Sequence, residues 1–486
     1  MPRRVVELEV PVPDAVVLAQ VDAGDAALPH QAGELLRVER GIGGVPARVH
    51  VHVHDRAAWG VGGHACRIGG ARRTGLAHPP RIRTAAGGGQ RRGQDAASGR
   101  VARILRPRRG RTATRGVLMR FGTHHLPLSP TPDDDLRVIG EQLEQIELAD
   151  RLGFEHCWLT EHLLSGESGF GDPIPLAGAI SQRTSQIRVG FAVLQMALTH
   201  PTRVFLQVNL LDNLLEGRLT LGIGRGSAFN EYEYVAFGAR SDGQRERMFE
   251  AIELLERAWA GEAAPFSGEH FTVSIPDVRP RPVQRPHPPI VLSVLSDDTL
   301  SWAAARGYGV MMPRLPVARV RERLGFFRRA MEEHGLPEAA AERALDRSTL
   351  LRSIYIADSD AQAEEEVRDA TFRLHDHLQR TRRGYNPADV DNRALAQQNA
   401  SPVWSSPDST PEEAVASLMS RGFILGSPET VRERIRELDE VGVRGLMITF
   451  NWGDLGHERV LRSMSRFAAE VMPAFARERV GSAAGD

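Results

Sequence analysis

The residues with the clearest chemistry stand where a short apolar run ends. Residues 218–223 have the length and the β-branched, aliphatic character of one buried strand, and Gly224-Arg225-Gly226 follows directly. Glycines let the backbone turn sharply and let a ligand approach closely, while an arginine offers a forked, permanently charged donor that suits a phosphate. By itself the pattern fits a solvated arginine in a tight strand-to-helix turn equally well, so its interpretation depends on the rest of the chain.

A second pair of residues suits the same kind of ligand. Ser296 and Thr299 lie three residues apart at the expected start of a helix over residues 297–306. Free N–H groups and hydroxyls at a helix N-terminus bind phosphate well, although Ser296 is also a good helix cap without any ligand. Asp297 and Asp298 follow it, and two carboxylates beside a phosphate would repel it unless they point outward.

The elements that must position these residues alternate regularly after Met119. The hydrophobic pattern predicts eight strand-and-helix units, which imply a parallel sheet closed into a (β/α)₈ TIM barrel. An open doubly wound sheet is the alternative, and the absence of G-x-G-x-x-G after the first strand favours the barrel. The strands are expected at residues 120–126, 156–160, 187–197, 218–223, 289–294, 309–312, 350–356 and 445–450, and the helices at 135–152, 173–184, 201–215, 244–260, 297–306, 317–333, 361–380 and 458–475.

In such a barrel the residues at the carboxyl ends of the strands converge on one site. The set of candidate residues contains two arginines, Arg225 and Arg314, and is otherwise mostly apolar and hydrogen-bonding. It lacks the spacing of metal ligands, so no metal is expected, and no G-x-S-x-G supports acyl transfer. A phosphate-bearing planar cofactor suits this composition best. The candidates are His124, His125, Glu161, His162, Gln195, Arg225, Ser296, Met312, Arg314, Asn451 and Trp452.

Three segments depart from the barrel pattern. Residues 1–118 form an Arg/Gly-rich extension, with twenty arginines against nine acidic residues, and we expect it to be poorly structured or to arise from a misassigned start before Met119. Its HVHVHD run at residues 50–55 reads as a chance cluster of histidines before a metal site. Residues 266–285 predict an inserted edge hairpin. Residues 384–410 predict a long polar loop, and a lid and a disordered surface loop are equally compatible with it.

The composition sets the broad class of the protein. The net charge of −1 argues weakly against nucleic acid as a partner. Two cysteines, Cys66 and Cys157, exclude a disulfide framework and fit a reducing compartment. No signal peptide and no membrane-spanning run is evident. We therefore expect a cytoplasmic protein without a membrane partner.

The ordered set of motifs resembles the bacterial luciferase-like flavin monooxygenase family. The resemblance covers residues 119–475 in one collinear order and rests on the stretch from Gly217 to Gly238 together with its flanking segments. Those segments are Trp158-Leu159-Thr160-Glu161-His162, Gly190-Phe191-Ala192-Val193, Thr199-His200-Pro201, residues 296–302 and Gly426-Ser427-Pro428-Glu429-Thr430.

The resemblance implies roles for individual residues. Arg225, with Gly226 and Ser227 beside it, and the pair Ser296 and Thr299 would hold the phosphate of flavin mononucleotide (FMN). Ala192 and Val193 match the family's non-proline cis peptide beneath the flavin ring. His162 falls on the first histidine of the family's Glu-His-His run and would be the catalytic base, whereas Leu163 replaces the second histidine. Gly224 stands where luciferase has a cysteine, which puts light emission in doubt and leaves flavin binding as expected.

The function implied by the resemblance is that of a monooxygenase. It would use reduced FMN, delivered by a separate flavin reductase, and O₂ to oxygenate a small organic substrate that the sequence does not identify. A hydride-transfer enzyme using the deazaflavin coenzyme F420 and a non-catalytic flavin-binding barrel are the alternatives. A homodimer is expected, because such barrels commonly pair.

Overall fold

The computed structural model describes residues 5–10, 36–39, 47–52, 119–391 and 410–475. The chain divides into two compact units, residues 1–108 and residues 109–486. The first unit contains three antiparallel strands in the order β1-β3-β2, namely β1 (Val5–Val10), β2 (Leu36–Glu39) and β3 (Ala47–His52). We did not expect a sheet in this Arg/Gly-rich extension. Its boundary with the barrel at residue 118 stays a prediction.

Part of the histidine run lies on one of these strands. In the register of β3 with β1, His50 stands opposite Glu7 and His52 opposite Val5. The two histidines therefore occupy alternate positions of one strand, as the sequence pattern requires. His54 lies outside the described residues.

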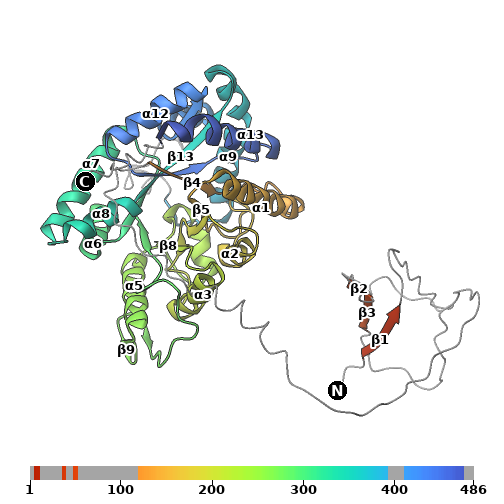
Figure 1. Ribbon diagram of the computed structural model, residues 1–486, viewed down its shortest axis with the longest axis vertical. Coiled ribbons are helices and arrows are strands. Elements are labelled where there is room, and N and C mark those ends of the chain that lie inside the picture. The colour runs from red at the N-terminus through yellow and green to blue at the C-terminus, as the bar shows by residue number, and fades with distance from the viewer. Residues whose placement is uncertain (1–4, 11–35, 40–46, 53–118, 392–409, 476–486) are drawn as a thin grey trace, which may run out of the picture. The chain divides into compact units, whose positions relative to one another are not determined.

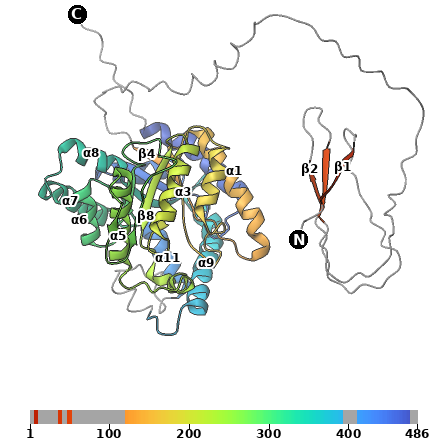
Figure 2. The same cartoon turned by 90° about the horizontal axis from the view of Figure 1, so that it is seen from below.

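The second unit is a closed (β/α)₈ barrel, as predicted. Each of its eight strands pairs in parallel with the next, and β11 closes the ring by pairing with β8. The helices lie around the outside of the strands (Figures 1 and 2). The ring runs β4 (Arg120–His125), β5 (His156–Leu159), β6 (Arg188–Phe191), β8 (Leu219–Gly224), β11 (Ile290–Ser293), β12 (Gly309–Met312), β13 (Thr349–Ile356) and β15 (Gly445–Thr449).

The predicted helices are also present. Four of them have the predicted bounds, and three of these four end at a left-handed glycine, Gly153, Gly261 or Gly307. The helices that correspond to the predicted ones are α1 (Asp135–Leu152), α2 (Pro173–Ser181), α3 (Pro201–Leu214), α5 (Gln244–Ala260), α6 (Asp297–Arg306), α7 (Val317–Glu333), α9 (Asp360–Tyr385) and α13 (His457–Arg466). The inserted hairpin is confirmed as β9 (Phe266–Ser267) and β10 (Thr272–Val273).

Two predicted elements are interrupted. The third strand is split into β6 and β7 (Leu194–Gln195), and the cis peptide between Ala192 and Val193 lies between these two strands. The last helix ends at Arg466 and continues as a π turn, Phe467–Val471, and a 3₁₀ turn, Met472–Phe475.

The structure also contains elements that the sequence pattern did not predict. They are α4 (Glu231–Ala236), α8 (Glu338–Arg347), α11 (Pro411–Gly422), β14 (Phe423–Gly426) and α12 (Pro428–Glu440). The additional strand β14 is accommodated because β13 is eight residues long. The first half of β13 pairs with β15, and the second half of β13, from Ser353, pairs with β14.

The barrel interior is filled by large side chains opposite glycines. Trp158, Val291, Met311 and Met447 form a buried cluster inside the ring. A Cβ atom on Gly190 would lie 2.4 Å from the ring of Trp158. Close packing of this kind leaves no space for added atoms, so the barrel is a solid core that presents functional groups only at its ends.

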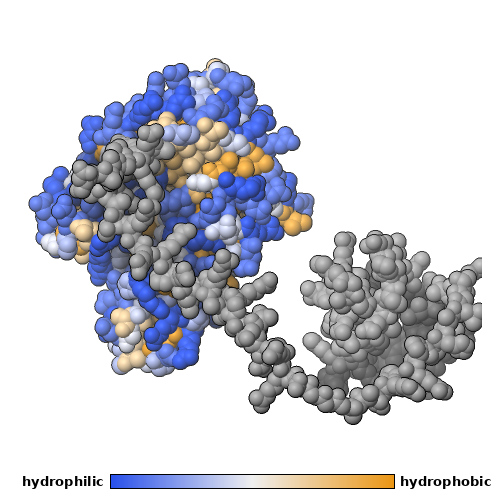
Figure 3. Space-filling view, in the orientation of Figure 1, coloured by the Kyte–Doolittle hydropathy of each residue, from blue (hydrophilic) through white to orange (hydrophobic). Residues whose placement is uncertain are grey.

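The surface of the barrel is mostly polar on the face that Figure 3 shows. On the face shown in Figure 3, hydrophilic residues predominate and apolar ones gather in small areas. Among the described residues, no helix is long and apolar enough to cross a membrane.

In the predicted loop after α9, Asn386 accepts a hydrogen bond from the Tyr232 N–H and donates to the Phe229 carbonyl. Residues 392–409, on which the choice between lid and surface loop depends, lie outside the described part.

Candidate active site

The end of β11 leads into a helix N-terminus that carries two converging hydroxyls. Ser296 caps α6, and its Oγ accepts a hydrogen bond from the Thr299 backbone N–H at 3.3 Å. The Oγ atom of Ser296 lies 3.0 Å from Thr299 Oγ1. The predicted pair is therefore brought together, at the positive end of a helix dipole.

The two aspartates beside this pair are held by arginines. Asp297 pairs with Arg323 of α7, and Asp298 pairs with Arg245 at 3.2 Å. Each carboxylate is thus neutralised by a cation from another element. The repulsion that the sequence raised against a phosphate at this helix end is correspondingly weakened.

Arg225 follows β8 directly and is partly buried. Its backbone carbonyl accepts a hydrogen bond from the Tyr234 hydroxyl at 2.8 Å, while no described residue pairs with its guanidinium. Gly226 has a φ of 101°, and a Cβ there would lie 2.2 Å from Gln195 Oε1. Only glycine fits this position. Ser227 begins the 3₁₀ turn Ala228–Asn230, and its hydroxyl makes no capping bond.

The peptide bond between Ala192 and Val193 is cis, as the resemblance implied. Both residues pack against the apolar cluster inside the ring. A Cβ on Gly224 would lie 2.6 Å from Val193 Cγ2. The absence of a side chain at Gly224 therefore lets the end of β8 approach the cis peptide, which joins two of the predicted site segments.

His162 lies between two carboxylates. Its Nδ1 donates to Glu233 Oε1 at 3.3 Å, and its Nε2 is 3.6 Å from Glu167 Oε1. Glu233 is fully buried and also accepts hydrogen bonds from the Leu163 N–H, the Asn230 amide and the Gln195 amide. Its carboxylate is therefore the centre of the cluster.

These contacts set the protonation of the site. Burial alone would lower the pKa of His162, but the Glu167 and Glu233 carboxylates outweigh it and raise this pKa to about 9. Burial raises the pKa of the Glu161 carboxyl to about 7. Burial would also raise the pKa of Glu233, yet its bonds to His162, Gln195 and Asn230 hold it below its usual value. At pH 7 the His162 side chain is thus a charged donor, whereas the catalytic base expected from the resemblance would need the neutral imidazole.

Sequence reasoning missed Glu167, Asn230, Glu233 and Arg382. Arg382 of α9 donates through Nε to Asn230 Oδ1 at 3.1 Å, and Asn230 in turn donates to Glu167 Oε2. Asn230 and Glu233 stand three residues apart after β8, a spacing that places side chains on one helical face. That signal was available in the sequence, whereas nothing local indicated Glu167 or Arg382.

The other predicted candidates lie in different surroundings: in the His162 cluster, against α1, in the core or at the end of the barrel. Gln195 belongs to the site, since its amide bridges the Glu161 carbonyl and Glu233. His125 instead bonds Thr123 and Gln142 of α1, and burial lowers its pKa to about 4. Met312 and Trp452 are core residues. His124, Arg314 and Asn451 remain at the end of the barrel.

Among the described residues, the fold assembles one group that could hold a metal ion and that the spacing did not predict. Ligand atoms of His162, Glu167 and Glu233 lie within 4.8 Å of one another. Both oxygens of Glu233 already accept hydrogen bonds from neighbouring side chains. The described contacts therefore make this group an ion-pair network.

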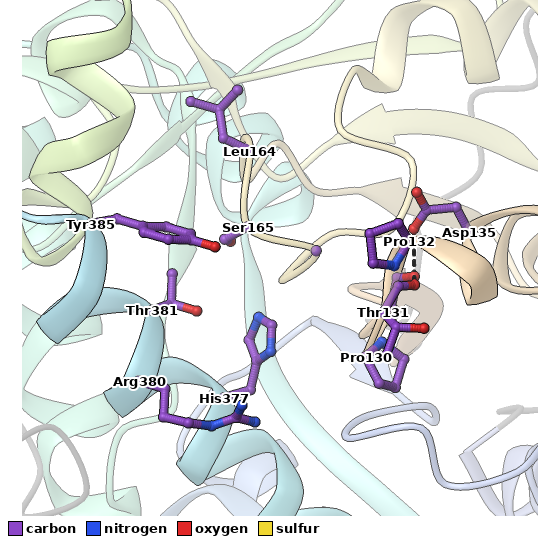
Figure 4. Close-up of a pocket in the computed structure, with 12 residues that line it drawn as sticks. Pro130, Thr131, Pro132, Asp135, Leu164, Ser165, His377, Arg380, Thr381 and Tyr385 are labelled. Carbon is purple, nitrogen blue, oxygen red and sulfur yellow. Dashed lines mark hydrogen bonds between the residues drawn. The ribbon is translucent and has the colours of Figure 1, made fainter.

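A cavity of about 340 Å³ lies beside the loop that carries His162. Figure 4 shows His377, Thr381 and Tyr385 of α9 on one side of it and Pro130, Thr131, Pro132 and Asp135 on the other. Leu164 and Ser165, which follow His162 closely in the sequence, form part of its wall. The loop after β5 thus contacts both the cavity and the charged cluster.

Comparisons with known proteins show which proteins this chain is similar to. The chain is 32% identical over 346 residues to the uncharacterized protein y4wF of Sinorhizobium fredii, covering 71% of this chain and 93% of that protein. It is 23% identical to the oxygenase component of the flavin-dependent trigonelline monooxygenase of Acinetobacter baylyi, covering 74% of this chain and 97% of that protein.

Solved structures share the fold. The monooxygenase RslO1 of Streptomyces bottropensis aligns with a TM-score of 0.61 and 25% identity, over 74% of this chain and all of that one. The oxygenating constituent of 3,6-diketocamphane monooxygenase of Pseudomonas putida, solved with FMN, aligns at 0.57 with 20% identity, over 73% and 98%. A coenzyme F420-dependent reductase of Methanopyrus kandleri aligns at 0.53 with 17% identity, over 74% and 99%.

A match to a family model tests whether these similarities reflect membership of one family or only a shared barrel fold. The luciferase-like monooxygenase family matches residues 119–445, which include the cis peptide, Arg225, the Ser296–Thr299 pair and the His162 cluster. This chain belongs to the luciferase-like monooxygenase family.

Proposed function

We propose that this protein is a flavin-dependent monooxygenase that uses reduced FMN and O₂ to oxygenate a small organic substrate. The observation that carries the proposal is the N-terminus of α6. There the Ser296 and Thr299 hydroxyls converge, and Asp297 and Asp298 each pair with an arginine. That arrangement suits a phosphate monoester. Arg225, whose guanidinium has no partner among the described residues, supplies the balancing charge.

The residues near the cis peptide fit the rest of such a cofactor. Gln195 Oε1 is buried and has no hydrogen-bond partner in the described structure. It lies beside Gly226, where a side chain is excluded. A buried acceptor without a partner is costly, and a ligand N–H would remove that cost. Ala192 and Val193 offer an apolar support for a planar ring.

His162 is proposed to act as a hydrogen-bond donor and proton source. Bound reduced FMN supplies the electrons that activate O₂, and the protein must provide protons and exclude water. Glu233 and Glu167 keep the imidazole protonated near pH 7, while Gln195 and Asn230 fix the position of Glu233. The role of base requires the neutral form, which these carboxylates disfavour.

The partners follow from the same proposal. The trigonelline relative is named as an oxygenase component, which supports a separate flavin reductase as the source of reduced FMN. The proposed location is the cytoplasm. The arguments against a nucleic-acid or membrane partner remain those of the composition.

A homodimer remains part of the proposal. Leu206, Leu210 and Leu214 recur every four residues on α3 and are 42%, 51% and 41% exposed. An apolar stripe of this kind on one helical face is suited to protein contact. Sedimentation of the wild type and of Leu210→Glu tests it: a dimer that the substitution converts to a folded monomer is expected, and a monomeric wild type contradicts it.

The test of the function is anaerobic titration of the protein with reduced FMN and, separately, with reduced F420, followed by O₂. Tight binding of FMN, lost in Arg225→Ala, and uptake of O₂ are expected. Binding of F420 alone without O₂ uptake would reassign the protein to hydride transfer. FMN binding without any O₂ chemistry would leave a non-catalytic flavin-binding barrel, and binding of neither cofactor would overturn the phosphate site.

A further inference from the structure

Arg314 is a cation at the end of the barrel that the proposed cofactor site does not use. It follows β12 and is partly buried. Its Nη2 donates to Ser353 Oγ at 2.9 Å and to Thr449 Oγ1 at 3.2 Å, and its Nε lies 3.2 Å from Ser353 Oγ. No carboxylate of the described residues pairs with it. Burial lowers its pKa to about 10.

The partners of Arg314 form one row across the barrel end. Ser353 of β13 is in register with Thr449 of β15, and Thr449 is in register with His124 of β4. Thr449 Oγ1 also lies 2.9 Å from His124 Nδ1. All the described contacts of the Arg314 guanidinium are with neutral hydroxyls, which cannot compensate a desolvated charge as a carboxylate does.

The layer below this row is apolar. Side chains two residues apart on a strand share a face, so Leu351 and Met447 lie beneath Ser353 and Thr449. Met447 belongs to the interior cluster and Leu351 packs against it. The cation therefore stands over an apolar floor, an arrangement that suits an organic molecule with an acidic group.

The position of Arg314 is separate from the phosphate site. Ser296 and Thr299 follow β11 and Arg225 follows β8, whereas the partners of Arg314 lie on β13 and β15, further round the ring. The stem of Arg314 is also fixed from outside, since a Cβ on Gly422 would lie 2.6 Å from its Cδ. Its guanidinium is thereby held over the β13 and β15 ends.

We infer that Arg314 binds the carboxylate of an acidic organic substrate, with Ser353 and Thr449 positioning its guanidinium. This inference rests on the proposed function, because it names the substrate class of that site. Nε and Nη2 of Arg314 donate to Ser353 and Thr449, which leaves the Nη1 protons for a charge-assisted hydrogen bond to a carboxylate. The substrate would thus be anchored by its acidic end at Arg314.

The test uses the full chain, with and without reduced FMN under anaerobic conditions, and calorimetric titration with three matched probe pairs. The pairs are benzoate and benzamide, nicotinate and nicotinamide, and octanoate and octanamide. At least one carboxylate should bind about tenfold or more tightly than its amide, the difference expected for a charged hydrogen-bonded pair. Arg314→Gln should remove this preference, and Arg314→Lys should keep part of it.

Two further variants separate recognition from general effects. Gly422→Ala keeps the charge but displaces the Arg314 stem, so it should weaken carboxylate binding. Arg352→Gln removes a neighbouring buried cation whose guanidinium donates to the Leu351 and Leu315 carbonyls, and it should leave the preference in place. These variants also keep the test usable if Arg314→Gln does not fold.

The outcomes are distinct. Equal binding of acid and amide in all three pairs, or no carboxylate binding at millimolar concentration, overturns the inference. An equal loss in Arg352→Gln would assign the effect to a general positive field, and a loss of FMN binding alone in Arg314→Gln would assign the guanidinium to the cofactor. Failure of the wild type to bind reduced FMN would defeat the proposed function, while titration of the cofactor-free chain would still test Arg314.

Discussion

The imidazole of His162 and the buried carboxylate of Glu233 form the central contact of the site, with Nδ1 and Oε1 3.3 Å apart. His162 comes from the loop after β5 and Glu233 from α4, 71 residues apart in the chain. Their pairing stores a proton at the carboxyl end of the barrel, at a pH at which an isolated histidine would be mostly neutral.

Glu233→Gln should lower the pKa of His162 from about 9 toward its ordinary value of 6.5. The substitution keeps the shape of the side chain but removes the charge that favours the imidazolium. Histidine resonances followed by NMR over pH 5–10 measure the change. Glu144→Gln is the matched control, since Glu144 pairs with His457 on the outer surface. An unchanged pKa would show that Glu233 does not hold the proton.

The stability of the protein should fall as the pH rises from about 6.5 to about 9. His162 has a higher pKa in the folded state than in the unfolded state, so its stabilising contribution is complete below the unfolded value of 6.5 and is lost through the folded value of about 9. Urea unfolding of the wild type and of His162→Gln at pH 6 and pH 9.5 should differ by about 1–3 kcal/mol at the lower pH only. A constant difference at both pH values would contradict the proton linkage.

Ser296→Ala should weaken binding of FMN by about tenfold and leave binding of riboflavin, which has no phosphate, nearly unchanged. Ser427→Ala is a closely matched control, because Ser427 caps α12 and its Oγ lies 3.1 Å from Thr430 Oγ1 in the same spacing. Both variants should lose about 0.5–2 kcal/mol of stability from the lost cap. If both lose FMN affinity equally, or neither does, Ser296 is only a cap.

Gly222→Ala should destabilise the barrel by about 3 kcal/mol or more. A Cβ there would lie 1.6 Å from the Phe191 carbonyl oxygen, so the backbone of β6 or β8 would have to move. Gly140→Ala in the exposed part of α1, where no atom lies within 4 Å, should instead stabilise the protein by about 0.5–1 kcal/mol. Thermal unfolding of both variants tests the contrast. Similar melting temperatures for the two would contradict the close approach of the strands.

A chain that starts at Met119 should fold and bind FMN as the full chain does. The family match begins at residue 119, and β4, the first barrel strand, begins at Arg120. Circular dichroism, thermal unfolding and FMN titration of the two chains measure this. Loss of folding or of FMN affinity in the shorter chain would show that residues 1–118 contribute to the barrel unit.

The sequence by itself determined the barrel and the pairing of Ser296 with Thr299 at the start of α6. The reason is that both depend on local signals: hydrophobic periodicity sets each strand and helix, and Ser296 and Thr299 lie within one helical turn. The ordered motifs added the cis peptide at Ala192–Val193, which local propensity would not have indicated.

Only the tertiary structure decided the charge of the site. The proton on His162 depends on Glu167 and Glu233, which come from a Gly-rich loop and from a short helix that the pattern did not predict. The Arg314 guanidinium is likewise positioned by hydrogen bonds to Ser353 and Thr449, which stand 39 and 135 residues away in the sequence. The pKa values and charge pairings arise from desolvation and from contacts between distant segments, and no periodicity in the sequence encodes either.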